Sequence, residues 1–418
     1  MSCSEWKSVK VGDIADILSG YAFKTKDFIE EGVPVVKIKN IIPPNIDISD
    51  TQHVSNEMYE EKIKYALNYN DVLISMTGSN VNQIASAVGK IGRVRLKDTK
   101  LLLNQRVGKL CVKDNSKCNY DYLYYYLIQP EIRYNLAANA GGSANQANIS
   151  PADIKNIDIK LPPLEEQEKI ANMLSSLDEK IELNNEMNKT LEEMAQSIFK
   201  RWFVDFEFPN ENGEPYKSSG GEMVEGELGM IPKGWEVKKM KDISNLMMGI
   251  SPKSSSYNND CIGVPLLNGA GDFYNGKIKP TKYTTEAKRV CNNGDIILSI
   301  RGTIGNLNFS DGEYCLGRSM CALRGKEHID NMLIFMYMSK SIEQLKSNAI
   351  GSVIVGLSKP DIEEIMIAYP NYEIRKSLND ILLNLYSRKK HNIEENNNIN
   401  AIRESLLPKL MSGDISTI

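Results

Sequence analysis

Residues with the chemistry for catalysis are few in this chain and stand far apart. The three histidines, His53, His328 and His391, are too widely separated to suggest one site. Adjacent carboxylates occur at Glu165-Glu166 and Glu363-Glu364, at predicted helix starts, where the helix dipole explains them better than acid–base catalysis. Glycine-rich phosphate loops, His-x-x-x-His metal motifs, nucleophile elbows and the Asn/Asp-Pro-Pro-aromatic motif of amino-methyltransferases do not occur. We therefore expect no catalytic residue, no metal site and no cofactor bound by this chain.

Size and composition indicate a protein of two or three domains. The chain has 418 residues, of which 41% are hydrophobic and 25% charged, as is typical of globular proteins. No apolar run is long enough to cross a bilayer, and the first residues lack a signal-peptide pattern. The seven cysteines form no Cys-x-x-Cys pair, so neither a disulfide framework nor a zinc site is indicated. We expect a cytoplasmic protein with no membrane contact.

The net charge of −4 is unevenly distributed along the chain. Residues 205–232 hold seven acidic residues against one lysine, and residues 161–204 hold nine against five basic residues. The stretches 1–160 and 233–369 are each slightly basic. Bulk charge therefore neither supports nor excludes a face that binds nucleic acid.

The chain is an internal duplication. Trp6, Asp13-Ile14 and Gly20 recur in the same order as Trp235, Asp242-Ile243 and Gly249. Later matches pair residues 32–34 with 263–265, 71–75 with 295–299, 103–110 with 316–323, and 150–162 with 358–370. So many matches in one order do not arise by chance. The first copy also holds extra polar residues within 76–86, at a loop tip where two copies of one scaffold would diverge in function.

Each copy has the same expected plan. Short β-branched runs come first, at 33–41, 71–76 and 101–112 in copy one and at 295–301 and 314–323 in copy two. A helix follows, at 122–138 or 331–348, then a Gly-Ser loop, a short strand and a long helix. The tyrosines at 120–126 are more consistent with core packing than with base stacking. The predicted fold class is α+β, with two similar mixed α/β domains separated by two long helices.

The two long helices carry heptad seams that predict an antiparallel coiled coil. The seam positions are Ile170, Leu174, Leu177, Ile181, Asn184, Asn188, Leu191, Ala195, Ile198 and Trp202, and then Leu378, Leu382, Leu385, Lys389, Asn392, Asn396, Ile399, Arg403, Leu406 and Leu410. Antiparallel pairing would place Asn188 against Asn392 and Asn184 against Asn396, where buried asparagines fix the register. The alternative is that residues 394–400 are solvated and another protein supplies the partner helix. The domain prediction is 1–160, a first helix at 161–206, an extended acidic linker at 207–232, a second domain at 233–370, and a second helix with tail at 371–418.

Several of these segments resemble the recurring signatures of specificity subunits of type I restriction-modification systems. They are Asp-Ile-Ile-Leu-Ser-Ile-Arg-Gly-Thr-Ile-Gly (295–305), Leu-Pro-Pro-Leu-Glu-Glu-Gln (161–167), Ile-Pro-Lys-Gly-Trp-Glu-Val (231–237) and Trp-Phe-Val-Asp-Phe-Glu-Phe-Pro (202–209). The resemblance implies two target-recognition domains that each read one half of a split double-stranded DNA target. It also implies that two methyltransferase subunits dock on the long helices, that restriction or translocase subunits join them, and that S-adenosylmethionine and ATP belong to those partners.

Polar residues on loops beside the matched strands are the candidates for DNA contact. Arginine pairs with guanine, and asparagine or glutamine with adenine, so such loops suit the reading of base edges. The base-reading candidates are Ser75, Thr77, Ser79, Asn80, Gln83, Gln105, Arg106, Ser143, Asn145 and Gln146 in copy one, and Arg301, Thr303, Asn306, Arg318, Ser319 and Ser352 in copy two. The phosphate candidates are Lys37, Lys39, Lys277, Lys279 and Lys282. Asp71 and Asp295 are expected to cap turns instead.

Other classes of function remain as alternatives at this level. The chain could be a coiled-coil scaffold without DNA specificity, or the specificity subunit of a related methyltransferase or nuclease complex outside type I. A fused methyltransferase or nuclease is the third class, and the missing catalytic motifs argue against it. Salt-sensitive binding to one bipartite duplex would distinguish a DNA reader from a coiled-coil scaffold. Catalytic activity of the chain alone would support the fused methyltransferase or nuclease.

Overall fold

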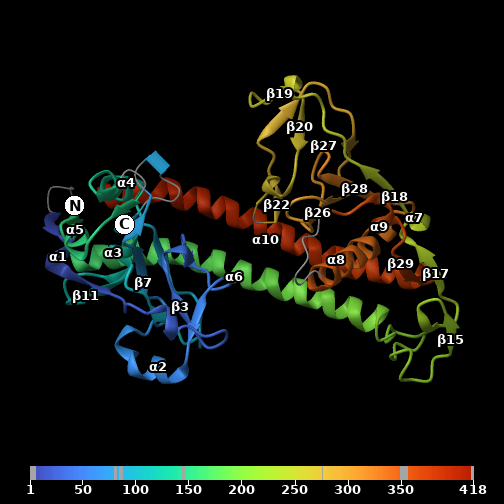
Figure 1. Cartoon of the computed structure of the whole chain (residues 1–418), viewed down its shortest axis with the longest axis horizontal. Coiled ribbons are helices and arrows are strands. Elements are labelled where there is room, and N and C mark those ends of the chain that lie inside the picture. The colour runs from blue at the N-terminus through green and yellow to red at the C-terminus, as the bar shows by residue number, and fades with distance from the viewer. Residues whose placement is uncertain are drawn as a thin grey trace. The chain divides into compact units, whose positions relative to one another are not determined.

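The computed structural model describes residues 6–79, 82–83, 88–143, 146–274, 276–348 and 356–415. The chain forms two compact units, one made of residues 1–182 with 396–418 and the other of residues 183–395. Each unit contains one copy of the duplication together with a part of both long helices, which are labelled α6 and α10 (Figure 1). The duplication predicted from the sequence is therefore also the division of the fold.

The first unit is built on a sheet with strand order β2-β11-β7-β9-β5-β4. These strands are β2 (Ala15–Ser19), β11 (Val107–Val112), β7 (Val72–Ser75), β9 (Ile91–Arg93), β5 (Asn45–Ile46) and β4 (Ile41–Ile42). Smaller sheets are formed by β10 (Leu102–Leu103), β3 (Val33–Val36) and β6 (Gln52–Val54), by β8 (Thr77–Gly78), β12 (Gly141–Ser143) and β13 (Gln146–Asn148), and by β1 (Lys7–Lys10) with β14 (Asp158–Leu161). The helices are α1 (Val11–Ile14), α2 (Asn56–Glu61), α3 (Tyr120–Leu127), α4 (Pro130–Ala138) and α5 (Pro151–Lys155).

The second unit repeats this plan with the strand order β18-β28-β25-β26. These strands are β18 (Ser244–Met248), β28 (Met320–Gly325), β25 (Ile296–Ser299) and β26 (Leu307–Phe309). A second sheet holds β19 (Tyr257–Asn258), β23 (Lys282–Thr284), β20 (Val264–Leu267), β27 (Tyr314–Leu316) and β24 (Val290–Cys291), and pairs are formed by β17 (Glu236–Lys239) with β29 (Met366–Tyr369) and by β21 (Phe273–Tyr274) with β22 (Lys277–Ile278). The helices are α7 (Met240–Ile243), α8 (Asp330–Asn348) and α9 (Lys359–Glu363).

The repeated serine and aspartate residues form the same cap in both copies. The Asp153 carboxylate accepts a hydrogen bond from the Ser150 backbone N–H at 2.7 Å, and Asp361 accepts one from Ser358 at 2.7 Å. These pairs are capping boxes at the starts of α5 and α9. Asp71 and Asp295 cap turns as predicted, since they accept from the backbone N–H groups of Asn68 and Asn292 at 2.8 Å.

The tyrosine cluster of copy one belongs to the core, as expected. Tyr122, Tyr124 and Tyr125 are buried in the main hydrophobic cluster of the first unit. The single helix predicted at 122–138 is wrong in one respect, because the structure has two helices that meet at Pro130. Proline begins α4 at its first position, where its missing N–H costs no hydrogen bond.

The long helices are α6 (Leu164–Phe203) and α10 (Tyr372–Ser412), and they pair in an antiparallel sense within each unit. In the second unit the Asn392 side chain donates to Asn188 Oδ1 at 2.9 Å, which is the predicted register. Asn184 donates to the Glu395 carboxylate at 2.7 Å in the same unit.

The same register holds in the first unit. There Arg403 forms an ion pair with Asp178 at 2.6 Å. Ile170 and Leu174 share one hydrophobic cluster with Leu410. Pairing through residues far apart in the chain is thus seen at the centre of the predicted seam and near Ile170 and Leu410 at one end of it.

The segment 207–232 is folded, so the expected extended connector is wrong. It contains the hairpin of β15 (Met223–Gly226) and β16 (Gly229–Pro232). Phe208 stacks on Trp235 at a ring-centroid distance of 4.9 Å, and Ile231 is buried in the same cluster. Aromatic burial of this kind offsets the entropy of ordering a glycine-rich, acidic segment.

Within the described part of the chain, none of the helices is long and apolar enough to cross a bilayer.

Candidate nucleic-acid interface

A cluster of loops in the second unit is held together by backbone hydrogen bonds. Ile300 N–H donates to Ser319 O at 2.8 Å, and Leu357 N–H donates to Ile300 O at 2.9 Å. Gly317 N–H donates to Leu267 O at 2.8 Å, and Ile250 N–H donates to Leu316 O at 2.9 Å. These bonds bring together loops that follow β18, β20, β25 and β27, and we call them the second loop cluster.

The first unit holds the same frame with other residues. Met76 N–H donates to Arg106 O at 2.9 Å, and Ile149 N–H donates to Met76 O at 3.0 Å. Asn104 N–H donates to Val36 O at 3.1 Å, and Tyr21 N–H donates to Leu103 O at 2.9 Å. Each bond has its counterpart in the second loop cluster, so these loops form a matching first loop cluster.

The repeated glycine in each copy is explained by this frame. A Cβ atom on Gly20 would lie 2.2 Å from the carbonyl oxygen of Leu103, and one on Gly249 would lie 2.1 Å from that of Gly317. Contacts this short exclude any side chain, so glycine allows the first loop of each cluster to approach the turn beside it.

The predicted contact residues of copy two gather on the second loop cluster. Arg301, Thr303 and Arg318 are exposed, whereas Asn306 and Ser319 are half-buried. The Asn306 backbone N–H donates to Ser299 Oγ at 2.9 Å, which positions the loop between β25 and β26. Ser352 lies outside the described residues.

The predicted contact residues of copy one need two corrections. Ser75 and Thr77 are only 2% and 7% exposed. Ser75 Oγ accepts a hydrogen bond from Lys90 N–H at 2.9 Å, and Thr77 Oγ1 donates to Asn148 at 2.8 Å. Their hydroxyl groups bond inside the domain, because the chain continues from β7 into β8, so the prediction that these two residues contact DNA is wrong.

The remaining candidates of copy one differ in position. Gln105 and Arg106 are exposed on the first loop cluster, in the turn between β10 and β11. Gln83 and Gln146 are exposed, and Ser79 is half-buried. Ser143 is in β12, while Asn80 and Asn145 lie outside the described residues.

The lysines proposed for phosphate contact differ in how available their side chains are. Lys37 lies over the ring of Phe28 at 4.1 Å and bonds to Gln52, and burial together with the charge of Lys39 lowers the pKa of Lys37. Lys39 pairs with Asp50 at 2.7 Å. These contacts make copy one's two lysines weaker phosphate candidates.

In copy two, Lys279 and Lys282 are exposed and Lys277 is half-buried. None of these three lysines forms an ion pair with a residue that the structure describes. They are therefore the better phosphate candidates.

The sequence did not single out every residue of the second loop cluster. Ser251 Oγ accepts a hydrogen bond from the Arg318 backbone N–H at 3.2 Å, and Ile250 beside it is 43% exposed. The Asn268 side chain reaches the turn at Gly317. The signal that could have found them is the repeated Gly249, which directly precedes Ile250 and Ser251.

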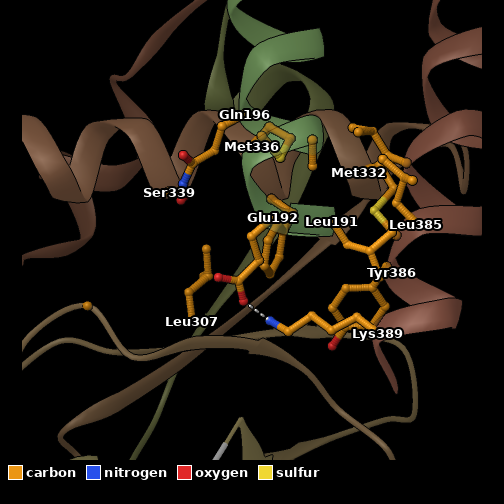
Figure 2. A pocket seen from close by; sticks show the side chains of 14 residues that line it. Leu191, Glu192, Gln196, Leu307, Met332, Met336, Ser339, Leu385, Tyr386 and Lys389 are labelled. Atoms are coloured by element: carbon orange, nitrogen blue, oxygen red, sulfur yellow. Dashed lines mark ion pairs between the residues drawn. The ribbon is translucent and has the colours of Figure 1, made fainter. Parts of the chain in front are cut away.

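The second unit contains a cavity of about 260 Å³, shown in Figure 2. Leu191, Met336 and Tyr386 line it, and Glu192 forms an ion pair with Lys389 at its side (Figure 2). Ala195 also lines it, at the position where the other copy has Arg403.

In the first unit the corresponding space holds a polar group instead. Arg403 pairs there with Asp178, whose carboxylate also accepts a hydrogen bond from Tyr125 at 2.7 Å. The cavity walls are mostly apolar and carry no cluster of groups suited to acid–base or metal chemistry. The cavity is therefore a packing difference between the copies.

Known proteins resemble the chain in both copies. The family model described as "Type I restriction modification DNA specificity domain" matches residues 3–193 and 232–402. A MjaX specificity subunit of a type I restriction enzyme from Methanocaldococcus jannaschii is 29% identical over 423 residues, which cover 98% of this chain and 94% of that protein. The MjaIX specificity subunit from the same organism is 24% identical over 430 residues, with 98% and 94% covered.

A solved structure shares the fold. The crystal structure of the S subunit of a type I restriction-modification system from M. genitalium superposes with a TM-score of 0.59 at 17% identity, over 97% of this chain and 96% of that one. Since the family model covers most of both copies, the chain belongs to the family of the type I restriction-modification DNA specificity domain.

Proposed function

We propose that this chain is the DNA-recognising subunit of a methyltransferase and restriction complex, and that each loop cluster reads one half of a split target. The observation that carries the proposal is the shared backbone frame with different exposed side chains. Gln105 and Arg106 stand on the first frame, and Arg301 and Arg318 stand on the second. A fixed scaffold with variable polar side chains suits the reading of two different base sequences.

The exposed lysines of copy two supply the complementary, sequence-independent part of binding. Lys279 and Lys282 are suited to phosphate oxygens, which fix the position of a protein on the duplex without reading its sequence. Such contacts release counterions, so binding is expected to weaken steeply with salt.

The chain itself is proposed to be non-catalytic. Two methyltransferase subunits are proposed to dock on α6 and α10, with restriction or translocase subunits joining them in the cytoplasm. S-adenosylmethionine and ATP would then be bound by those partners.

Duplicated exposed apolar residues on the helices support two equivalent docking positions. Met194 of α6 is 46% exposed, and its counterpart Ile402 of α10 is 50% exposed. Single exposed apolar side chains are common on any protein surface, so the support comes from their recurrence at the same place in both copies. An exposed apolar position that occurs once on α6 and once on α10 fits the docking of two copies of the same methyltransferase subunit.

Sequencing of methylated bases in cells with and without this gene tests the proposal. Methylation at one split motif, with two defined halves around a fixed gap, should disappear when the gene is deleted and return when it is restored. An unchanged pattern in cells that express the whole system would contradict it. The double variant Arg318→Ala/Gln105→Ala is the comparison for gene deletion. It changes only exposed turn residues, so the chain should remain folded and the methylated motif should still be lost.

A further inference from the structure

The turns that present Gln105 and Arg318 occupy the same place in the two loop clusters. Val107 N–H donates to Asn104 O at 2.9 Å in the first turn, and Met320 N–H donates to Gly317 O at 3.0 Å in the second. The hydrogen bonds on either side of these turns also match, as described above. Gln105 and Arg318 are therefore equivalent in position and differ in side chain.

Both side chains are available at the surface. Gln105 and Arg318 are exposed, and each turn is held through backbone atoms. Neither side chain forms an ion pair or hydrogen bond with the residues that the structure describes. The backbone of each turn is already fixed by hydrogen bonds. A bidentate contact with a base would therefore cost only the rotamer entropy of the glutamine or arginine side chain.

The two side chains suit different bases. Arginine places two N–H donors against the O6 and N7 acceptors of guanine in the major groove. Glutamine has one donor and one acceptor, which match N7 and N6 of adenine. The same turn therefore presents a side chain suited to guanine in copy two and a side chain suited to adenine in copy one.

We propose that Arg318 reads a G·C pair in the half-target bound by residues 233–370, and that Gln105 reads an A·T pair at the equivalent place in the half-target bound by residues 1–160. This inference rests on the proposed function, since it assigns bases within the split target. It makes the two half-targets unequal at a defined position, although the two domains share one frame.

Reciprocal exchange of these residues tests the inference. Arg318→Gln and Gln105→Arg each install the side chain that the other copy already carries on the same frame. Each variant is introduced into cells that carry the complete system, and the methylated motif is read by sequencing. Arg318→Gln should change one position of one half from G·C to A·T, and Gln105→Arg should make the opposite change in the other half. The preference between the two base pairs should shift on the order of tenfold or more.

Lys282→Gln is the control for a phosphate contact. It should reduce methylation at all targets alike and leave the motif unchanged. If Arg318→Gln did the same, Arg318 would be a phosphate contact and the inference would be overturned. An unchanged motif at full methylation in both exchange variants would also overturn it. If wild-type cells showed no split motif that depends on this gene, the proposed function itself would fail, which is a separate outcome.

Discussion

Asn392 of α10 donates a buried hydrogen bond of 2.9 Å to Asn188 of α6, although the two residues are far apart in the chain. Asn392 is fully buried and Asn188 is 8% exposed. A buried polar pair in the helix seam costs stability but favours one register, because a slip would leave both amides without these partners. The pair thus fixes how the two helices meet in the second unit.

Replacing Asn392 with alanine should destabilise the second unit. The Asn188 carbonyl oxygen would lose its donor in a buried place, at a cost of about 1–3 kcal/mol. Urea unfolding followed by circular dichroism measures this change. Asn398→Ala, at an exposed position of the same helix, is the control and should stay within about 0.5 kcal/mol. Equal stability of the two variants would contradict the seam assignment.

The start of each long helix is tied to its domain by different chemistry. In copy one the Gln167 side chain donates to Pro162 O at 2.8 Å and accepts from Asn119 N–H at 2.8 Å. In copy two the equivalent Arg375 donates to Pro370 O at 3.2 Å and pairs with buried Asp330 at 2.6 Å. An amide tether in one copy thus corresponds to an ion pair in the other.

Arg375→Ala should be strongly destabilising, by about 3–5 kcal/mol, because it leaves the carboxylate of Asp330 buried and unpaired. Burial already raises the pKa of Asp330, against the opposing effect of Arg375. The double variant Asp330→Asn/Arg375→Gln imitates copy one and should be less destabilised than Arg375→Ala. Urea unfolding of the native chain, Arg375→Ala and the double variant measures their free energies of unfolding. The exposed Lys376→Ala is the control. A double variant no more stable than Arg375→Ala would mean that the charges are not the cause.

The Glu364 carboxyl should contribute stability that depends on pH. Hydrogen bonds from Lys239 at 2.6 Å and Lys241 at 2.5 Å lower its pKa from 4.5 to about 2. A lowered carboxyl pKa stabilises the folded state above the unfolded pKa, and this contribution is lost as the pH falls from about 5 towards 2.

Glu364→Gln should therefore be slightly less stable than the native chain at pH 7, and the difference should shrink as the pH falls. The effect is small because the group is exposed, and it should diminish in 1 M salt. Urea midpoints between pH 7 and pH 3 measure it, with the exposed Glu313→Gln as control. A difference that grew on acidification would show that the sign is wrong.

Filling the cavity of the second unit should stabilise the chain. Ala195→Leu adds apolar volume to a space of about 260 Å³ lined by Leu191, Met336 and Tyr386. The expected gain is about 1 kcal/mol in the free energy of unfolding. Ala401→Leu makes the same change at an exposed position of α10 and should have little effect. Destabilisation by Ala195→Leu alone would mean that the cavity walls cannot accommodate the side chain.

The sequence predicts much of this fold because the chain is repeated. Ser150 with Asp153 and Ser358 with Asp361 carry the same cap signal twice, so chance matches are easily excluded. The seam asparagines predict the helix register, since polar residues at seam positions need one another. Both signals are local or periodic, which is why they can be read without coordinates.

The errors arise where burial depends on residues far away in the chain. The acidic segment 207–232 has no periodic pattern, and its order depends on Trp235 and the surrounding aromatic cluster. Ser75 and Thr77 looked like loop-tip hydroxyls because polar residues follow β7. Thr77 is buried because β8 pairs with β13, which begins 68 residues after β8 ends at Gly78. Ser75 is buried where β7 pairs with β11, at Val107. Tertiary contacts of this kind leave no local signal.

Exchange of the first domain tests the central claim most directly. Residues 1–160 would be replaced with the matching domain of a relative that directs methylation to a different target, and methylated bases would be sequenced in cells that carry the complete system. The account predicts that one half of the split motif changes to that of the donor, while the other half and the gap between them stay the same. A motif that stayed unchanged, or that changed in both halves at once, would contradict independent reading by the two domains.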